Sequence, residues 1–342
     1  MNSVNEMNLL YTMDDAYAMQ AGVSMVSLFL HNPKIRFHLY IISDNISKDN
    51  LERLKRLVAE YAHKIDIIEM PDIEKKTGVR FATNGWYLAA YCRLFLCELI
   101  PEETDKLLYM DPDTLVTGSI RELADIMASE EFENCPLAAA LDSKATFKRF
   151  HGFGKNEKYY NDGVMLINAG WWRKYSIQKI IYDEIRRRDG RSIDVDQSYI
   201  NCILINKIMT LPIKYNVMPV YYKSYEDYLK LSGYRPEEIY TKEEIRAATD
   251  KPVIIHFAGD AKYRPWYKDC RHSMRDAWME QLGKTEWSSF IPAEMAPEEE
   301  SSFMAGIKSK TVKSLIHIRS FAKLYVKYKY GFEVKLFREG KQ

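Results

Sequence analysis

The chain opens with a stretch whose apolar pattern decides the fold class: residues 8–44 read NLLYTMDDAYAMQAGVSMVSLFLHNPKIRFHLYIISD. Residues 8–13 and 36–43 are apolar runs of strand length, whereas residues 17–30 have the apolar spacing of a helix. A second helix is predicted at 47–62, opened by the capping residue Ser47, and a third strand at 64–70. This β-α-β-α-β order favours an α/β fold with a mostly parallel sheet, helices on both faces, and ligands beyond the carboxyl ends of the strands.

The remaining apolar runs extend this pattern along the chain. Strands are predicted at residues 106–110, 137–141, 163–168 and 253–257. Helices are predicted at residues 87–99, 177–188, 197–206, 242–249 and 272–282. Pro292, Pro297 and three consecutive glutamates predict an acidic linker over residues 291–302. We therefore expect one large domain over residues 1–290, this linker, and a C-terminal tail over residues 303–342.

Composition places the chain among ordinary globular proteins. Of its 342 residues, 46% are hydrophobic and 28% charged, which excludes wholesale disorder and collagen. The net charge of +1 gives no argument for nucleic acid, and we expect none as a partner. The five cysteines are scattered without metal or redox spacing and predict a reducing compartment. We find no signal peptide and no apolar run long enough to cross a bilayer, and so expect a cytoplasmic protein.

The tail carries the charge asymmetry of the chain. Residues 301–342 contain ten Lys or Arg and two Glu, so that the tail is +8 and residues 1–300 are −7. A helix drawn through the tail places an apolar and aromatic stripe on one face, ending at Gly331: Leu315, Ile318, Phe321, Ala322, Tyr325 and Tyr328. Basic residues fall mainly on the other face: Lys313, Arg319, Lys323 and Lys327. We favour peripheral binding to an anionic membrane surface, and packing against the large domain is the alternative.

The most informative short string is Asp111-Pro112-Asp113, which follows the apolar strand at 106–110. If the chain stays extended, which Pro112 favours, the two carboxylates share a face. Such a pair can hold a divalent cation and leave coordination positions open for a diphosphate. Taken alone, the same string also fits a simple turn after a strand.

A second string, His256-Phe257-Ala258-Gly259, ends the strand predicted at 253–257 and precedes Lys262. A lone histidine at a strand end is most often a core residue. Here, Gly259 permits close approach of the backbone to a ligand, and Lys262 can neutralise a phosphate. Imidazole together with two carboxylates is a donor set suited to Mn²⁺.

The first strand ends in Asp14-Asp15-Ala16-Tyr17. Asp14 can act simply as a helix N-cap. An acid beside an aromatic residue at this turn also suits a uracil ring stacked on Tyr17, with its imide N–H donated to a carboxylate. The chain has no glycine-rich dinucleotide motif and no P-loop, which counts against NAD and ATP.

Six blocks in this order resemble the family-8 retaining glycosyltransferases, which include bacterial lipopolysaccharide galactosyl- and glucosyltransferases and the glycogenins. The resemblance spans residues 8–282 and is far more specific than any single motif. The blocks are Met13-Asp14-Asp15-Ala16-Tyr17, Tyr91-Cys92-Arg93-Leu94, Asp111-Pro112-Asp113, Tyr160 to Asn168, Asp196-Gln197, and His256 to Gly259 with Lys262, Pro265 and Trp266.

The resemblance implies a nucleotide-sugar-binding GT-A fold over residues 1–290, a UDP-hexose donor, a glycan or glycolipid acceptor, and transfer with retention. It implies Asp111, Asp113 and His256 as ligands of Mn²⁺, with Mg²⁺ as the alternative, and Pro112 beside them at the donor. Gly259 and Lys262 are then expected at the diphosphate, and Asp15 and Tyr17 at the uridine. The residues expected around the donor sugar are Arg93, Asp142, Asn161, Asp162, Asp196 and Gln197.

Catalysis on this interpretation needs a stabilised leaving group and a group beneath the anomeric carbon. Gln197 is the candidate for the second task, either as a weak nucleophile or as a carbonyl dipole. Asp142 and Asp196 complete the expected catalytic set as acceptors for sugar hydroxyls; as single residues they equally fit surface acids.

This sequence departs from the family pattern at several positions. Relatives often have Asn at Ala16, Ala at Asp162 and an acid at Ser198. Lys262 is separated from Pro265-Trp266 by two extra residues, Tyr263 and Arg264, so we expect the closing loop to differ from that of the family.

Two rival functions come from other classes. Asp111-Pro112-Asp113 after an apolar strand also fits the first motif of haloacid-dehalogenase-type, Mg²⁺-dependent phosphatases, in which the first Asp is the nucleophile. That motif normally stands near the start of the chain, and the second acidic pair has no clear counterpart here. A binding or membrane adaptor module is the non-enzymatic rival, supported only by the tail. Neither rival explains His256 together with Lys262.

Overall fold

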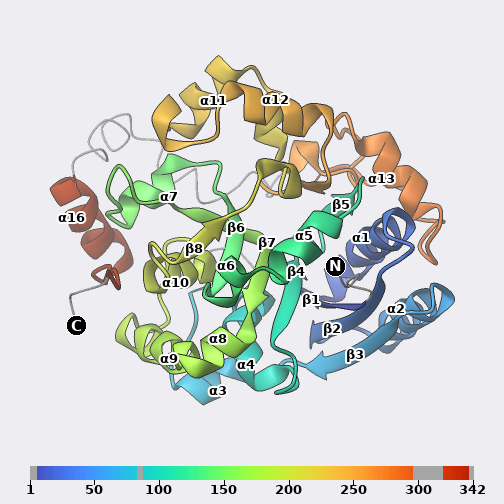
Figure 1. Cartoon of the computed structure of the whole chain (residues 1–342), viewed down its shortest axis with the longest axis horizontal. Coiled ribbons are helices and arrows are strands. Elements are labelled where there is room, and N and C mark those ends of the chain that lie inside the picture. Colours follow the sequence, from blue (N-terminus) through green and yellow to red (C-terminus); the bar gives the residue numbers. More distant parts are fainter. Residues whose placement is uncertain (1–5, 83–87, 296–318, 339–342) are drawn as a thin grey trace.

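The computed structural model describes residues 6–82, 88–295 and 319–338, and its centre is a seven-stranded sheet in the order β3-β2-β1-β4-β7-β6-β8 (Figure 1). Its strands are β1 (Glu6–Asp14), β2 (Arg36–Asp44), β3 (Lys64–Glu69), β4 (Lys106–Met110), β6 (Leu137–Leu141), β7 (Tyr160–Asn168) and β8 (Ile208–Thr210). A second, two-stranded sheet pairs β5 (Thr114–Val116) with β9 (Ile254–His256).

The strand directions confirm the predicted mixed, mostly parallel sheet. Strands β3, β2, β1 and β4 pair in parallel, and β6 pairs in parallel with β8. Strand β7 is antiparallel to both of its neighbours, β4 and β6. The strands predicted at 8–13, 36–43, 64–70, 106–110, 137–141 and 163–168 all belong to this sheet, whereas the one predicted at 253–257 became β9 of the small sheet.

Helices surround the sheet. The α-helices are α1 (Ala18–His31), α2 (Lys48–Glu60), α3 (Ile73–Thr77), α4 (Leu96–Leu99), α5 (Arg121–Met127), α6 (Glu130–Glu133), α7 (Ala145–Phe150), α8 (Ala169–Lys174), α9 (Ile177–Arg187), α10 (Val195–Ile203), α11 (Tyr225–Ser232), α12 (Lys242–Asp250), α13 (Arg275–Leu282) and α16 (Arg319–Tyr330). The 3-10 turns are η1 (Asp15–Tyr17), η2 (Leu88–Phe95), η3 (Ile213–Tyr215), η4 (Pro219–Tyr222), η5 (Pro236–Glu238) and η6 (Ala261–Tyr263). Among the described helices, none combines the length and the apolarity needed to cross a bilayer.

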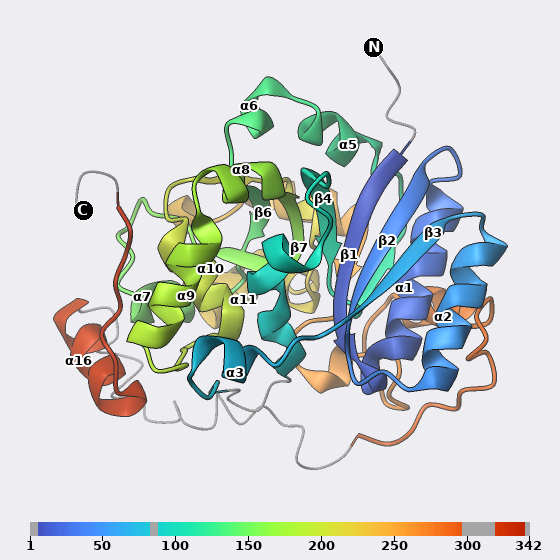
Figure 2. The same ribbon diagram turned by 90° about the horizontal axis from the view of Figure 1, so that it is seen from below.

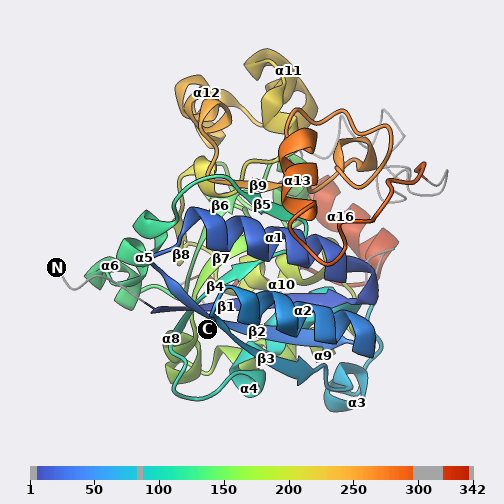
Figure 3. The same cartoon turned by 90° about the vertical axis from the view of Figure 1, so that its right-hand side faces the viewer.

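The two faces of the sheet hold two separate hydrophobic cores, because successive strand residues point to opposite sides. Leu9 and Tyr11 of β1 pack with α1 and α2, which lie together on one face (Figure 2). Leu10 packs instead with η2, α9 and α10 on the other face. Helix α1 is also covered by β5 and α13, so that the small sheet is held against the large one (Figure 3).

Two helix predictions differ from the structure near the carboxyl edge. The helix predicted at 87–99 is the 3-10 turn η2 followed by the short α4, and residue 87 itself lies outside the described residues. The side chains of η2 are buried almost all round, so no solvent-facing stripe of an ordinary amphipathic helix is present. Helix α10 begins at Val195 instead of residue 197, which places Asp196 and Gln197 in its first turn.

The tail helix α16 packs against the large domain. Ala322 and Val326 are buried in one cluster with Phe150 of α7, and the ring of Tyr325 stacks on Phe150 with centroids 5.4 Å apart. Tyr328, predicted on the same stripe, is 89% exposed, so the stripe is split between two faces. The left-handed backbone of Gly331 ends the helix as predicted. Residues 296–318, which include most of the predicted linker and Lys313, Leu315 and Ile318, lie outside the described residues.

Candidate active site

The acidic pair lies in the connection between the two sheets. Asp111 directly follows β4, and its backbone N–H donates to the carbonyl of Gly163 at 2.7 Å. Asp113 directly precedes β5, whose Thr114 is paired with His256 of β9. Because β5 and β9 are antiparallel neighbours, residues far apart in the sequence meet at the carboxyl edge of the large sheet. The structure therefore brings together the three residues predicted as metal ligands.

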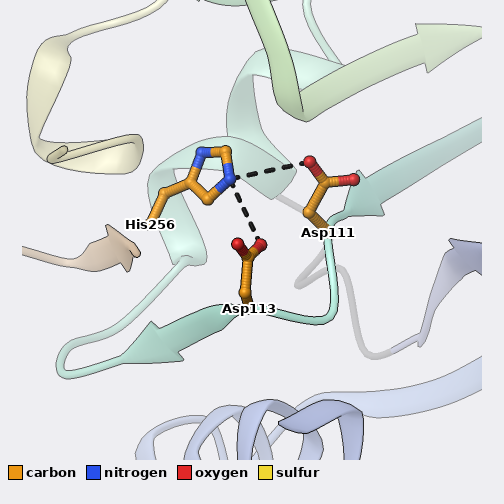
Figure 4. Close-up of side chains that lie close together, drawn as sticks. All are labelled: Asp111, Asp113 and His256. Carbon is orange, nitrogen blue, oxygen red and sulfur yellow. Dashed lines mark ion pairs between the residues drawn. The ribbon is translucent and has the colours of Figure 1, made fainter. Parts of the chain in front are cut away.

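Figure 4 shows these three side chains converging on one point. His256 Nε2 lies 3.2 Å from Asp113 Oδ1 and 3.6 Å from Asp111 Oδ2. All three candidate ligand atoms lie within 4.8 Å of one another. Two hard oxygens and an imidazole nitrogen this close together fit a divalent cation.

Burial and the charges of their neighbours shift the pKa values of these three groups. Burial raises the pKa of Asp111, although Arg93 and His256 lie beside it. Burial acts in the same direction on Asp113, but the neighbouring His256 outweighs it and the pKa of Asp113 is lowered. Burial lowers the pKa of His256, and the two aspartates overcome that effect and raise it. The three groups are therefore electrostatically coupled, and positive charge beside the two aspartates stabilises their ionised forms.

Arg93 lies at the centre of a buried acidic group. Its guanidinium is 2.9 Å from Asp111 Oδ1 and 2.8 Å from Asp196 Oδ2, and Nη1 donates to the backbone carbonyl of Asp162 at 2.9 Å. It also lies over the ring of Tyr109, 4.2 Å from the centroid. Burial raises the pKa of Asp196 well above its usual range despite Arg93. One guanidinium faces more carboxylates than it can neutralise, and a divalent cation would relieve this excess.

Gly163 leaves room for the cluster. A Cβ at this position would lie 2.1 Å from His256 Cε1 and 2.8 Å from Asp111 Oδ2. The close approach of β7 to the acidic pair therefore depends on the absence of a side chain.

Amide side chains continue from His256 toward α10. His256 Nδ1 is 3.0 Å from Asn216 Oδ1, and Asn216 Nδ2 donates to Asn161 Oδ1 at 2.8 Å. Asn161 Nδ2 in turn donates to Gln197 Oε1 at 3.1 Å, as does the backbone N–H of Asp162. Asn161 and Gln197 were predicted at the donor sugar, whereas Asn216 was not predicted.

Two carboxylates lie beyond Gln197. Its Nε2 donates to Asp194 Oδ2 and, at 3.4 Å, to Asp142 Oδ2. Asp142 is buried, its Oδ1 accepts from the backbone N–H of Lys144 at 2.7 Å, and burial raises its pKa. Asp142 and Asp196 are therefore not the surface acids that the alternative interpretation described.

The two acids of the first βα turn, Asp14 and Asp15, have different hydrogen-bond partners. Asp15 Oδ1 accepts from the backbone N–H of Ser47 and from Asn50 Nδ2, both at 2.8 Å, at the start of α2. Asp14 Oδ1 is buried and has no hydrogen-bond partner among the described residues, and burial raises the pKa of Asp14. Asp14 makes no side-chain cap to η1. Tyr17 meets Trp266 edge-on, with ring centroids 6.4 Å apart.

The loop after β9 carries two cations with different surroundings. Gly259 has a φ of 96°, a conformation that favours glycine. The ammonium of Lys262 pairs closely with Asp260. Arg264, one of the two extra residues, lies over Trp266, 5.9 Å from the ring centroid, and its charge contributes to lowering the pKa of Asp113.

Four residues of this region were missed by the sequence interpretation: Tyr109, Asp194, Asn216 and Arg264. Tyr109 donates to Asp111 Oδ1 at 2.6 Å. In the sequence, Tyr109 looks like one more apolar residue of β4. Asn216 lies in a segment without a regular spacing of apolar residues. A polar side chain at the carboxyl end of a strand was a usable signal for Asp111 and His256, but not for Asn216 or Asp194. Arg264 was visible as an insertion.

Comparisons with known proteins agree with this geometry. Residues 8–270 match the sequence model of the family Glycosyl transferase family 8. General stress protein A of Bacillus subtilis is 26% identical over 83% of this chain and 95% of its own length. The lipopolysaccharide 1,3-galactosyltransferase of Salmonella typhimurium is 25% identical over 84% of this chain and 81% of its own length. A crystal structure of galactosyltransferase LgtC with donor and acceptor sugar analogs covers 86% of this chain and 98% of its own, with a TM-score of 0.66 and 24% identity.

The match over most of the chain and the shared architecture define a glycosyltransferase of the GT-A fold. The chain belongs to glycosyl transferase family 8. This membership decides between the alternatives left open by Asp111-Pro112-Asp113, because it favours sugar transfer over phosphate-ester hydrolysis.

Proposed function

We propose that this enzyme transfers a hexose, glucose or galactose, from a UDP-sugar to a glycan or lipopolysaccharide-type acceptor, with retention of configuration and with Mn²⁺ as the preferred metal. The observation that carries the proposal is the convergence of Asp111, Asp113 and His256 at the carboxyl edge of the sheet. The named functions of the relatives, a lipopolysaccharide 1,3-galactosyltransferase and a lipopolysaccharide 1,2-glucosyltransferase, support the donor and acceptor classes.

In this proposal Asp111, Asp113 and His256 hold the metal, with Pro112 keeping the acidic pair in register. A divalent cation there supplies electrostatic stabilisation to the departing diphosphate. Lys262 adds positive charge at the diphosphate when the diphosphate replaces Asp260 as its partner. Gly259 lets the backbone approach the diphosphate. Arg264 supplies a second cation on the side of Asp113.

The uridine end is assigned to the first βα turn. We assign the imide N–H of uracil to Asp14, whose Oδ1 is buried without a partner among the described residues, and the ring to Tyr17. Asp15, predicted for this role, is engaged by Ser47 and Asn50; we keep it at the edge of the nucleoside pocket.

The donor sugar lies among Arg93, Asp142, Asn161, Asp162 and Asp196. Three of these residues contact Gln197 directly: Asn161, Asp142 and the backbone N–H of Asp162. Asp142 and Asp196 accept hydrogen bonds from sugar hydroxyls. Gln197 lies beneath the anomeric carbon, where its carbonyl oxygen stabilises positive charge as the acceptor attacks on the face that the diphosphate leaves. An α-linked donor then gives an α-linked product.

We also propose that the enzyme works in the cytoplasm, bound peripherally to the inner face of the membrane through its tail. The outer face of α16 supports this proposal, because Leu324 and Tyr328 are 67% and 89% exposed next to Lys323 and Lys327. Exposed apolar residues flanked by lysines suit the interface of an anionic leaflet.

The test is UDP release measured with Mn²⁺ across a panel of nucleotide sugars, first without an acceptor and then with candidate glycans. Asp113→Asn, which keeps the size of the side chain and removes its charge, should abolish turnover and leave the circular dichroism spectrum unchanged. Full activity in excess EDTA or in Asp113→Asn would overturn metal dependence. Hydrolysis of p-nitrophenyl phosphate with Mg²⁺, blocked by Asp111→Asn, would instead establish the phosphatase.

A further inference from the structure

Six side chains form one hydrogen-bonded row between the candidate metal centre and the first turn of α10. Its members are His256, Asn216, Asn161, Gln197, Asp194 and Asp142. We call it the amide row, because its three central members are carboxamides. Both of its termini are functional groups of another kind: an imidazole at one end and two carboxylates at the other.

The amide row has a single direction. Each carboxamide has one donor end and one acceptor end, so fixing one member fixes the next. Gln197 Nε2 donates to Asp194 Oδ2, and its Oε1 therefore accepts from Asn161 Nδ2. Asn161 Oδ1 then accepts from Asn216 Nδ2. Every donor in the chain of amides points toward the carboxylates.

The direction of the row determines the tautomer of His256. Because Asn216 uses Nδ2 toward Asn161, only its Oδ1 faces the imidazole, and His256 Nδ1 must donate to it. The lone pair of the neutral ring is then on Nε2, the atom that faces Asp111 and Asp113. Partners that fix the second nitrogen of a metal-binding histidine in this way strengthen metal binding.

We propose that Asp194 is a positioning residue that anchors the amide row: it holds the amide of Gln197 in one orientation and, through Asn161 and Asn216, fixes the tautomer of His256. This inference rests on the proposed function in so far as Gln197 and His256 serve catalysis. Nothing in the family resemblance assigned a role to Asp194.

The backbone conformation next to Asp194 indicates that its surroundings hold this residue in place. The next residue, Val195, has a φ of 42°, a left-handed conformation that is strongly disfavoured for a β-branched residue. Such strain persists where the surroundings hold it in place, and it is concentrated at functional sites. The backbone N–H of Asp194 donates to Ser198 Oγ at 2.8 Å, and the hydroxyl of Tyr159 donates to Asp194 Oδ2 at 3.2 Å.

A raised pKa at this end of the row does not disturb the anchoring hydrogen bonds. Burial, and then the nearby Asp142 and Asp162, raise the pKa of Asp194 well above its usual range. Oδ2 accepts both of the hydrogen bonds made by this carboxyl group, so that a proton on Oδ1 leaves the direction of the row unchanged. Gln197 Nε2 donates to both Asp194 and Asp142, so that both of its N–H groups are engaged.

The first test observes the amide of Gln197 directly, in metal-free protein labelled with ¹⁵N at glutamine. The chain has five glutamines, and the side-chain signals of Gln197 are those lost in Gln197→Ala. In Asp194→Ala these signals should shift, and their hydrogen exchange should accelerate at least about tenfold. Asp194→Asn keeps an acceptor oxygen and should retain most of the protection. Asp183→Ala, an exposed aspartate of α9, is the control and should leave the signals in place.

The second test measures Mn²⁺ binding at the His256 end of the row, and then whether Asp194 acts through Gln197. Asn216→Ala should weaken Mn²⁺ binding by about 10- to 100-fold, and Asp194→Ala should weaken it less but measurably. In UDP-sugar turnover, adding Asp194→Ala to Gln197→Ala should cost nothing further, because Asp194 acts through Gln197. Unchanged Gln197 signals in Asp194→Ala, or fully additive losses, would overturn the proposal. A wild-type enzyme without any UDP-sugar turnover would reject the proposed function instead, and the amide signals and Mn²⁺ affinity would still decide the role of Asp194.

Discussion

At Gly163 the presence or absence of one methyl group decides whether the acidic pair and His256 can converge. A Cβ there would lie 2.1 Å from His256 Cε1, a separation that requires the imidazole to move. We expect Gly163→Ala to weaken Mn²⁺ binding by at least about tenfold, since ligand geometry tolerates little displacement. Isothermal titration with Mn²⁺ measures the loss.

Gly118→Ala is the matched control for this substitution. Its Cβ would lie 3.5 Å from Val253 Cγ2, an ordinary contact, in the loop that follows β5. Mn²⁺ affinity equal to wild type in both variants would show that Gly163 is not needed for the site.

Single residues also show where prediction from sequence stops. Asp111, Asp113 and His256 could be found because chemically distinctive side chains follow apolar strands. Asn216 and Asp194 could not, since their importance lies in partners that are distant in sequence and come together only through the crossing of β9, η3 and α10. Nor could the sequence show that Asp15 is held by Ser47 and Asn50 at the start of α2, because these partners lie far along the chain.

The secondary-structure elements were predicted best where a long apolar period repeats, as in β1, α1 and β2. The direction of β7 was not predictable, because an antiparallel strand buried on both faces has the same apolar pattern as a parallel one. The 3-10 form of η2 and the early start of α10 depend on tertiary contacts around Arg93 and Asp194, which override local propensity.

The loop containing η6 gives a prediction at this scale. Lys262 is paired with Asp260, whereas the charge of Arg264 acts on Asp113 beside the candidate metal centre. We expect Arg264→Ala to lower kcat/KM for the UDP-sugar more than Lys262→Ala does. Steady-state kinetics of the two variants measure the order. If Lys262→Ala lowered kcat/KM more than Arg264→Ala, Lys262 would be the main contact to the diphosphate.

A second prediction concerns the link between α7 and α10. His151 Nδ1 donates to the carbonyl of Phe147 at 2.7 Å and Nε2 accepts from Ser198 Oγ at 2.8 Å, so the ring is neutral in the folded protein. Burial lowers the pKa of His151 to about 3. As pH falls below 6.5, its usual value, the unfolded chain takes up the proton first, and the folded state loses stability down to the folded pKa.

The loss amounts to about 1.4 kcal/mol per pH unit below the unfolded pKa, or about 2 kcal/mol between pH 7 and pH 5. His151→Gln, which does not titrate, should be less stable than wild type at pH 7, and the difference should narrow by about this amount at pH 5. Urea unfolding of both proteins at the two pH values is the measurement. A constant difference would mean that the pKa of His151 is the same in the folded and the unfolded chain.

At the scale of the whole molecule, the sequence favoured a membrane-bound basic tail, with packing against the large domain as the alternative. Amphipathicity alone cannot distinguish a face that packs on protein from one that lies on lipid, since both bury apolar side chains. The structure divides the tail helix: Ala322 and Val326 are buried against α7, whereas Leu324 and Tyr328 are exposed. Part of the stripe predicted to face the membrane is therefore packed against α7, and membrane binding as proposed here uses the opposite, exposed face of α16.

The exposed and the buried face of α16 lead to separate predictions. Leu324→Ser with Tyr328→Ser should reduce pelleting with anionic vesicles at low salt and leave the melting temperature unchanged, because both side chains are exposed in the folded chain. Val326→Ala should lower the stability by about 2 kcal/mol through lost packing and leave vesicle binding intact. Binding of the wild type should weaken at high salt, because each lysine near the surface contributes about 1 kcal/mol of electrostatic attraction. Equal pelleting of the wild type and the outer-face variant would contradict membrane binding through Leu324 and Tyr328, and an unchanged melting temperature in Val326→Ala would contradict the packed inner face.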